Sequence, residues 1–148
     1  ISGCAVYRDA PAAIDWLCRA FGFELRLRVE GEGGRIEHCE LAYGDGLLMV
    51  AQEDSQAARV WKRALRSPQS LGGLTTQTLM IFVDDAEAHC AQALAAGAEI
   101  VEELAEHDYG EAFWCDRSYG ARDPEGHVWW LTQRLRSPTQ PHPALVRA

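Results

Sequence analysis

The sequence has no long apolar run and few positive charges, and both shortages exclude classes of partner. No stretch approaches the run of about 18 apolar residues that a membrane-spanning helix needs, so we expect no membrane partner. Lys and Arg number 14 against 22 Asp and Glu, which leaves a net charge of −8. A protein with that charge repels phosphate backbones, so we expect no nucleic-acid partner and favour a neutral or cationic one.

Cysteine is present, but not in the patterns that give it a function. The five cysteines are scattered, with no C-x-x-C pair and no zinc-type spacing. An odd number of them also argues against a framework of disulfides. We therefore interpret most of them as reduced, small buried side chains and expect a cytoplasmic protein.

The length and composition indicate one soluble unit. The chain has 148 residues, of which 47% are apolar and 24% charged, values typical of a globular protein. That length buries a core without disulfides but is too short for two independent catalytic domains. We expect a single domain over residues 1–148.

An internal repeat divides this domain into two halves. Residues 4–24 and 79–99 each contain an apolar strand, an aspartate able to cap a helix, a short helix and a glycine. The glycines, Gly22 and Gly97, are 75 positions apart (97 − 22). The apolar stripes of the helices imply an offset of 76 instead, and they consist of Ile14, Leu17, Cys18 and Phe21 in the first copy and Ala86, Cys90, Ala93 and Leu94 in the second. The register between the copies is therefore uncertain by one residue.

Three strand-like segments follow each helix. They are predicted at 24–29, 37–43 and 47–51, then at 99–104, 117–122 and 127–133, with tight turns at 44–46 and 123–126. This pattern predicts an α+β fold of two tandem βαβββ modules, residues 1–52 and 75–135. Residues 53–74 are predicted to be a linker that allows a helix over 56–66, and residues 136–148 an extended tail.

Two motifs carry a family resemblance. The segment RDAPAAIDWLCRAFGFE (8–24) and the turn Asp-Pro-Glu-Gly-His (123–127) resemble the vicinal oxygen chelate superfamily over about residues 2–133. That superfamily includes glyoxalase I, extradiol dioxygenases, fosfomycin-resistance enzymes and bleomycin-resistance proteins. The resemblance implies that the sheets of two modules face each other around one cavity, and it implies a homodimer. The sequence leaves open whether the modules pair within one chain or across the dimer.

The metal centre of this superfamily can be tested residue by residue. Metal-dependent members place His, Glu or Gln on the first and last strands of each module, facing the cavity. Counting from the helix caps and turn glycines puts these positions at Ser2, Val50, Thr78 and Trp130, or at Gly3 and Gln77 if the register slips. A divalent metal needs about three or four convergent lone-pair donors, which valine and an indole N–H do not supply. We therefore expect no metal and no cofactor.

Strand alternation predicts what lines the cavity instead. If Trp130 faces the cavity, its strand also contributes Val128 and Thr132, while Trp129 and Leu131 face the helix. The other predicted wall residues are Leu48, Val50, Thr78, Met80 and Phe82. An inserted segment after Tyr109 carries Phe113 and Trp114, which either cover the cavity mouth or pack as core. Trp61 in the linker either does the same or contributes to a dimer contact.

One polar pair leaves a catalytic alternative open. His38 and Glu40 lie two apart on one strand and share a face, as a polar rim pair or as an acid and base. The favoured hypothesis is a metal-free protein that sequesters an aromatic or cationic compound, such as an antibiotic. The alternatives are a lyase, isomerase or dioxygenase with metal or acid–base chemistry, and a pure interaction module. The predicted ligand-binding residues are Val50, Thr78, Met80, Phe82, Trp130, Val128, Phe113, Trp114, Tyr109, Trp61, His38 and Glu40.

Overall fold

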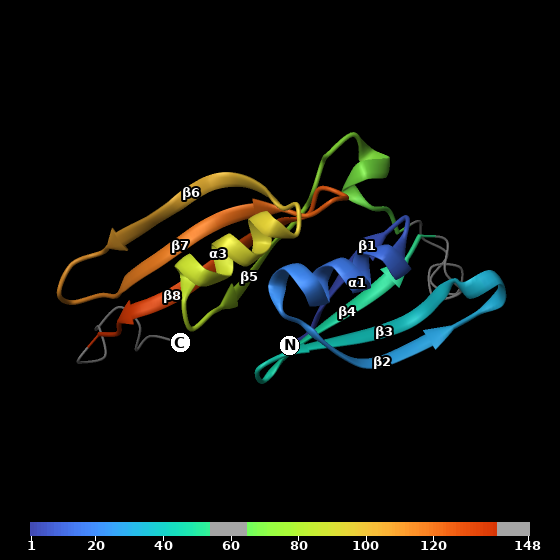
Figure 1. Cartoon of the computed structure of the whole chain (residues 1–148), viewed down its shortest axis with the longest axis horizontal. Coiled ribbons are helices and arrows are strands. Elements are labelled where there is room, and N and C mark those ends of the chain that lie inside the picture. The colour runs from blue at the N-terminus through green and yellow to red at the C-terminus, as the bar shows by residue number, and fades with distance from the viewer. Residues whose placement is uncertain (54–64, 139–148) are drawn as a thin grey trace.

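A computed structural model describes residues 1–53 and 65–138 and contains two four-stranded sheets, each covered by one helix (Figure 1). The first module consists of β1 (Gly3–Tyr7), α1 (Ala10–Phe21), β2 (Glu24–Glu30), β3 (Ile36–Tyr43) and β4 (Gly46–Gln52). The second consists of β5 (Thr78–Phe82), α3 (Ala86–Ala95), β6 (Glu99–Asp108), β7 (Cys115–Arg122) and β8 (Val128–Arg136). The strand orders, β1-β4-β3-β2 and β5-β8-β7-β6, are the same arrangement twice, which confirms the α+β fold of two tandem modules. Most of the predicted linker helix, Trp61 and the tail from residue 139 lie outside the described residues.

Aspartate caps fix the start of both helices. The Asp9 side chain accepts a hydrogen bond from the Ala12 amide in α1, and Asp85 accepts from two amides at the start of α3. These caps are 76 positions apart (85 − 9), so the helical stripes gave the correct offset. Gly22 ends α1 with a φ of 74°, a left-handed conformation that favours glycine. The prediction for Leu94 was wrong, because this side chain is 54% exposed and lies off the buried face of α3.

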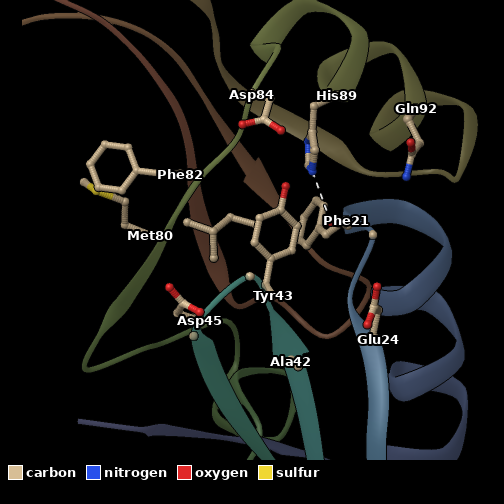
Figure 2. Close-up of a pocket in the computed structure, with 14 residues that line it drawn as sticks. Phe21, Glu24, Ala42, Tyr43, Asp45, Met80, Phe82, Asp84, His89 and Gln92 are labelled. Carbon is tan, nitrogen blue, oxygen red and sulfur yellow. Dashed lines mark hydrogen bonds between the residues drawn. The ribbon is translucent and has the colours of Figure 1, made fainter.

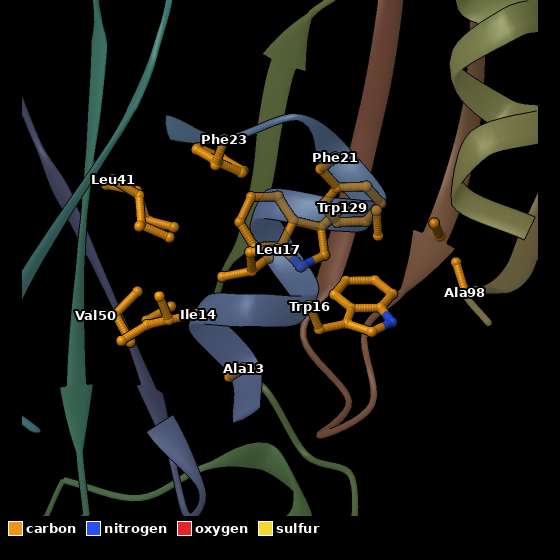
Figure 3. Close-up of a cluster of buried hydrophobic side chains, with 14 of the residues drawn as sticks. Ala13, Ile14, Trp16, Leu17, Phe21, Phe23, Leu41, Val50, Ala98 and Trp129 are labelled. Atoms are coloured by element: carbon orange, nitrogen blue, oxygen red, sulfur yellow. The ribbon is translucent and has the colours of Figure 1, made fainter. Parts of the chain in front are cut away.

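The core lies between the helices and the sheets and is continuous across the two modules. Trp129 on β8 is 1% exposed, and its ring centroid lies 5.3 Å from that of Phe21 and 5.8 Å from that of Phe23 (Figure 3). An indole of the second module therefore packs on two aromatic rings of the first. Trp16 adds a polar link, because its Nε1–H donates to the Ala96 carbonyl at the end of α3, at 2.8 Å.

The turn before β8 joins the second module to the start of α1. The Glu125 carboxylate accepts hydrogen bonds from the backbone amides of Arg8 and Asp9, at 2.7 and 2.9 Å. Asp123 accepts a hydrogen bond from the Tyr7 hydroxyl at 2.7 Å. Carboxylates buried in this way hold otherwise unsatisfied donors at a helix start, so the two modules are fastened to each other within the chain.

The two helices are too short to cross a membrane. Within residues 1–53 and 65–138, neither helix has the length and apolar character that crossing a membrane requires.

Candidate functional site

Strand pairing corrects the position of one predicted wall residue. Cys4 on β1 lies opposite Met49 on β4, and Met80 on β5 lies opposite Trp130 on β8. Cys4 and Met80 are equivalent by the offset of 76 (80 − 4), so Met49 is the counterpart of Trp130. The prediction of Val50 was wrong because Gly46 is the first residue of β4, whereas the turn glycine of the second module precedes β8. A shift of one residue moves a strand side chain to the other face of the sheet.

Val50 therefore belongs to the core. It is 1% exposed and lies beside Ile14 of α1, and Leu48 on the same strand is 6% exposed (Figure 3). Both were predicted to line the cavity, and both instead face the helix. The residues at the corrected metal positions are Ser2, Met49, Thr78 and Trp130.

This donor set does not fit the metal centre of the resembling enzymes. It offers two hydroxyls, one thioether and one indole, and no imidazole or carboxylate. Across the described part of the chain, no group of three or more His, Cys, Asp or Glu side chains is arranged to hold a metal ion. No metal chemistry can be assigned to these positions.

The second sheet presents the predicted residues on its face away from α3. Along β5, Leu79 and Ile81 pack against the core, while Thr78, Met80 and Phe82 are exposed. The exposed fractions of Met80 and Phe82 are 60% and 54%, which is high for large apolar side chains. On β8 the half-buried Val128 and Trp130 alternate with the buried Trp129 and Leu131, as predicted, whereas Thr132, which was predicted to share the face of Val128, is 4% exposed.

The inserted aromatic residues form the tip of the β6–β7 hairpin. The Tyr109 amide donates to the Trp114 carbonyl at 3.1 Å, and the two rings lie 5.6 Å apart. The ring of Phe113 lies 6.0 Å from that of Trp114. The Arg134 guanidinium lies 5.6 Å from the Trp114 ring and 5.3 Å from the Phe82 ring, and it pairs with an aspartate on β7. The insertion thus packs on its own hairpin and on Arg134.

His38 and Glu40 contact each other on β3. The distance from His38 Nε2 to Glu40 Oε1 is 3.2 Å, and Arg26 lies 3.9 Å from the same carboxylate. The pair shares a face of the strand, as the sequence indicated, but neither residue lines the cleft described next.

A cleft of about 850 Å³ lies between the modules, where the β3–β4 turn approaches β5 and α3 (Figure 2). We call it the intermodular cleft. Of the predicted residues, Met80 and Phe82 line it, so β5 contributes both to the open sheet face and to the cleft. The full lining is Phe21, Gly22, Glu24, Ala42, Tyr43, Gly44, Asp45, Gly46, Met80, Ile81, Phe82, Asp84, His89 and Gln92.

His89 is the one titratable nitrogen base of this lining, and the structure engages both of its ring nitrogens. Its Nε2 lies 3.1 Å from the Phe21 carbonyl, which can only accept, so Nε2 carries the proton. Its Nδ1 lies 2.7 Å from the Tyr119 hydroxyl and accepts from it. Desolvation by burial lowers the pKa of His89, which favours this neutral form. His89 is half-buried, because its side of α3 faces the end of α1.

Three carboxylates line the cleft, and the sequence reasoning missed all of them. Glu24, Asp45 and Asp84 have no hydrogen bond or ion pair from their side chains to any described residue, and no described Lys or Arg lines the cleft. Burial and the charge of Asp84 together raise the pKa of Tyr43, whose ring lies in the middle of the cleft. These acids come from β2, a turn and the start of α3, so no sequence spacing relates them.

A comparison with protein-family models assigns the chain to a superfamily. The model described as Glyoxalase/Bleomycin resistance protein/Dioxygenase superfamily matches residues 4–131. The chain belongs to this superfamily. The chain also resembles a mycobacterial protein: the uncharacterized protein Rv0887c of Mycobacterium tuberculosis is 34% identical over 131 residues, which cover 88% of this chain and 72% of the relative.

Solved structures with the same fold include two bacterial proteins. TioX from Micromonospora sp. ML1 is 33% identical, with a TM-score of 0.69 over 91% of this chain and 98% of TioX. A glyoxalase/bleomycin resistance protein from Streptomyces sp. CB03234 is 21% identical, with a TM-score of 0.60 over 89% of this chain and 97% of its own. At that identity the second likeness speaks for the fold alone. Superfamily membership leaves the chemistry to the site, because one fold supports many functions.

Proposed function

We propose that this superfamily member is a metal-free binding protein that sequesters an aromatic small molecule, neutral or cationic, such as an antibiotic. The observation that carries the proposal is the intermodular cleft, in which unpaired carboxylates lie beside aromatic and apolar side chains. Its volume of about 850 Å³ is within the range of small-molecule sites. The description of the matching family model, which names bleomycin resistance proteins, agrees with such a role.

The apolar part of the cleft favours a flat ligand. Tyr43 from β3 lies in the middle of the cleft, and Phe82 and Met80 line it from β5 with their side chains on the side of that strand away from Tyr43 (Figure 2). A planar ring stacked on one of these aromatic rings gains roughly 0.5–1.5 kcal/mol beyond the burial of its surface. Met80 adds a flexible thioether that adapts to rings of different shape.

The polar groups support binding rather than catalysis. A general base needs a free lone pair within reach of the substrate, and both ring nitrogens of His89 are already engaged. His38 and Glu40 form a pair of suitable chemistry, but they lie outside the cleft. The donor set at the corrected metal positions does not suit the superfamily's metal-dependent reactions.

A matched set of acridines tests the proposal. Aminoacridine is cationic, acridine is neutral at mildly alkaline pH, and acridine carboxylate is anionic, while all three share one ring system. We expect calorimetric titration to give the tightest binding for aminoacridine and the weakest for the carboxylate. No binding of any of the three would contradict the proposal.

A pair of variants places the site. Phe82→Ala should weaken aminoacridine binding by about three- to tenfold, which corresponds to the loss of one stacking contact. Tyr109→Ala is the matched control, because Tyr109 is 55% exposed and Phe82 54% exposed, but Tyr109 lies at the hairpin tip. An equal loss in both variants would move the site away from the cleft.

Three further expectations belong to the same proposal and have separate tests. Elemental analysis of the purified protein should give no stoichiometric nickel, zinc, iron or manganese. Light scattering should give the mass of a homodimer, in which a second copy would bury exposed side chains such as Leu27 and Val29. Cell fractionation should recover the protein from the cytoplasm.

A further inference from the structure

We infer that the intermodular cleft selects a planar aromatic ligand that carries two separate positive groups. The inference rests on the proposed binding function and adds the ligand's charge pattern to it. It starts from the placement of the three carboxylates. In Figure 2, Asp45 and Glu24 lie on either side of the Tyr43 ring, and Asp84 lies toward α3.

The carboxylates surround the cleft without converging on one point. No three acidic, His or Cys side chains among the described residues are arranged to hold a metal ion, so a compact cation would satisfy only part of this charge. A ligand with positive groups at two places can approach two carboxylates at once. The ring that joins those groups would lie against Tyr43, between the carboxylates.

The described residues that line the cleft supply no full positive charge, and the nearby Arg134 guanidinium lies over the Phe82 ring, 5.3 Å from its centroid. Elsewhere in the described chain some acidic side chains are paired, as Glu99 is with Arg122 and Asp108 with Arg136. In the cleft lining there is no described Lys or Arg, and burial lowers the pKa of His89, which favours its neutral form. Because the carboxylates lie at separate places, two positive groups can each approach one of them, which gains more attraction than a single group does.

Because the modules are duplicated, the cleft has an equivalent position at the other end of the module junction, between the β7–β8 turn and the start of α1. There, the turn between β7 and β8 fills the space and places Glu125 against the Arg8 and Asp9 amides. The corresponding turn between β3 and β4, which carries Asp45, lines the cleft but makes no described side-chain bond to the start of α3. One end of the module junction is closed by the chain, and the other end keeps a cavity with aromatic walls.

Two dyes with one ring system test the charge pattern. Ethidium and propidium share the phenanthridinium ring, which bears one positive charge, and propidium carries an additional quaternary ammonium on a short alkyl chain. Fluorescence titration at low salt should give at least about tenfold tighter binding of propidium. The difference should shrink as salt is added, because the gain is electrostatic.

Charge-matched variants separate the cleft from the overall net charge. Asp45→Asn removes a cleft carboxylate, and Glu32→Gln removes an exposed one in the β2–β3 connection, so both leave a net charge of −7 (−8 + 1). We expect Asp45→Asn to reduce the propidium preference several-fold and Glu32→Gln to leave it unchanged. Asp84→Asn should act like Asp45→Asn. Thermal unfolding of each variant confirms that the fold is intact.

The possible results separate this inference from the proposed function. Equal affinities for the two dyes would overturn the inference and leave the binding function in place. A propidium preference that falls equally in Asp45→Asn and Glu32→Gln would also overturn it, because net charge would then explain the preference. If neither dye nor any acridine binds, both the inference and the proposed function fail.

Discussion

The Tyr7 hydroxyl donates a 2.7 Å hydrogen bond to the Asp123 carboxylate, across 116 positions of sequence. Tyr7 ends the first strand of the first module, and Asp123 opens the last turn of the second. The same carboxylate also accepts from the indole of Trp129 and from the amides of Glu125 and His127. Desolvation raises the pKa of Asp123, but its hydrogen bonds and the neighbouring His127 outweigh that effect and hold the pKa below its ordinary value.

Tyr7→Phe should destabilise the protein by about 1.5–3 kcal/mol, the usual worth of a hydrogen bond to a charged group. The ring stays in place, so little packing is lost. Urea unfolding measures the change, and Tyr109→Phe is the control because its ring is 55% exposed. A Tyr7→Phe variant as stable as the wild type would show that the other three donors compensate fully.

Two variants check which face of each sheet is buried. Val50→Ala should cost about 2–3 kcal/mol, because the side chain is 1% exposed and its loss leaves a cavity beneath α1. Met80→Ala should change stability by no more than about 0.5 kcal/mol, since that side chain is 60% exposed. If urea unfolding gave the larger loss for Met80→Ala, the result would support the prediction that Val50, and not Met49, is the counterpart of Trp130.

This pair also shows how far the sequence could lead. The Asp9 cap, the apolar stripe ending at Phe21 and the glycine after it are local signals, so the helix and the duplication could be predicted from them. The face of Val50 could not, because it depends on how many residues the two turns use before their strands begin. A local pattern does not show how many residues each turn uses, and here the count from the turn glycine to the equivalent strand position differs by one residue between β4 and β8.

The cleft could not be predicted from the sequence, for another reason. Its carboxylates belong to three elements, and only the packing of α1 against α3 brings them to one cavity. Met80 and Phe82 were predicted because alternation along one strand is local. Asp45 looked like an ordinary turn residue, and nothing in the pattern distinguishes a turn that docks from one that leaves a space.

The contact between the helices gives a further prediction. Trp16 is 6% exposed, stacks edge-on against Phe21 at 4.9 Å and donates to the Ala96 carbonyl. Trp16→Phe should lower the free energy of unfolding by about 1–3 kcal/mol, from the lost hydrogen bond and the space left by the smaller ring. Trp114→Phe, at the hairpin tip, should cost clearly less in the same calorimetric measurement. Equal costs would mean that the α1–α3 contact adds no stability.

His89 should make the stability of the module junction depend on pH. Its pKa in the folded protein is lowered from an ordinary value of 6.5, so between those two values the unfolded chain binds more protons. The His89 contribution is therefore fully present above about pH 6.5 and declines as the pH falls toward the folded pKa. Urea unfolding between pH 7.5 and 5.5 should show this loss.

His89→Gln isolates the imidazole from the other acids and bases. A glutamine amide can donate to the Phe21 carbonyl and accept from Tyr119, yet it does not titrate. We expect the variant to unfold with a smaller pH dependence over this interval, while Asp123, whose pKa is lowered, still gives a loss at more acidic pH in both proteins. Protonation of His89 would also add a positive charge to the cleft lining, so cationic dyes should lose affinity more steeply on acidification in the wild type than in His89→Gln. The same acid response in both proteins would show that His89 controls neither the junction nor the cleft.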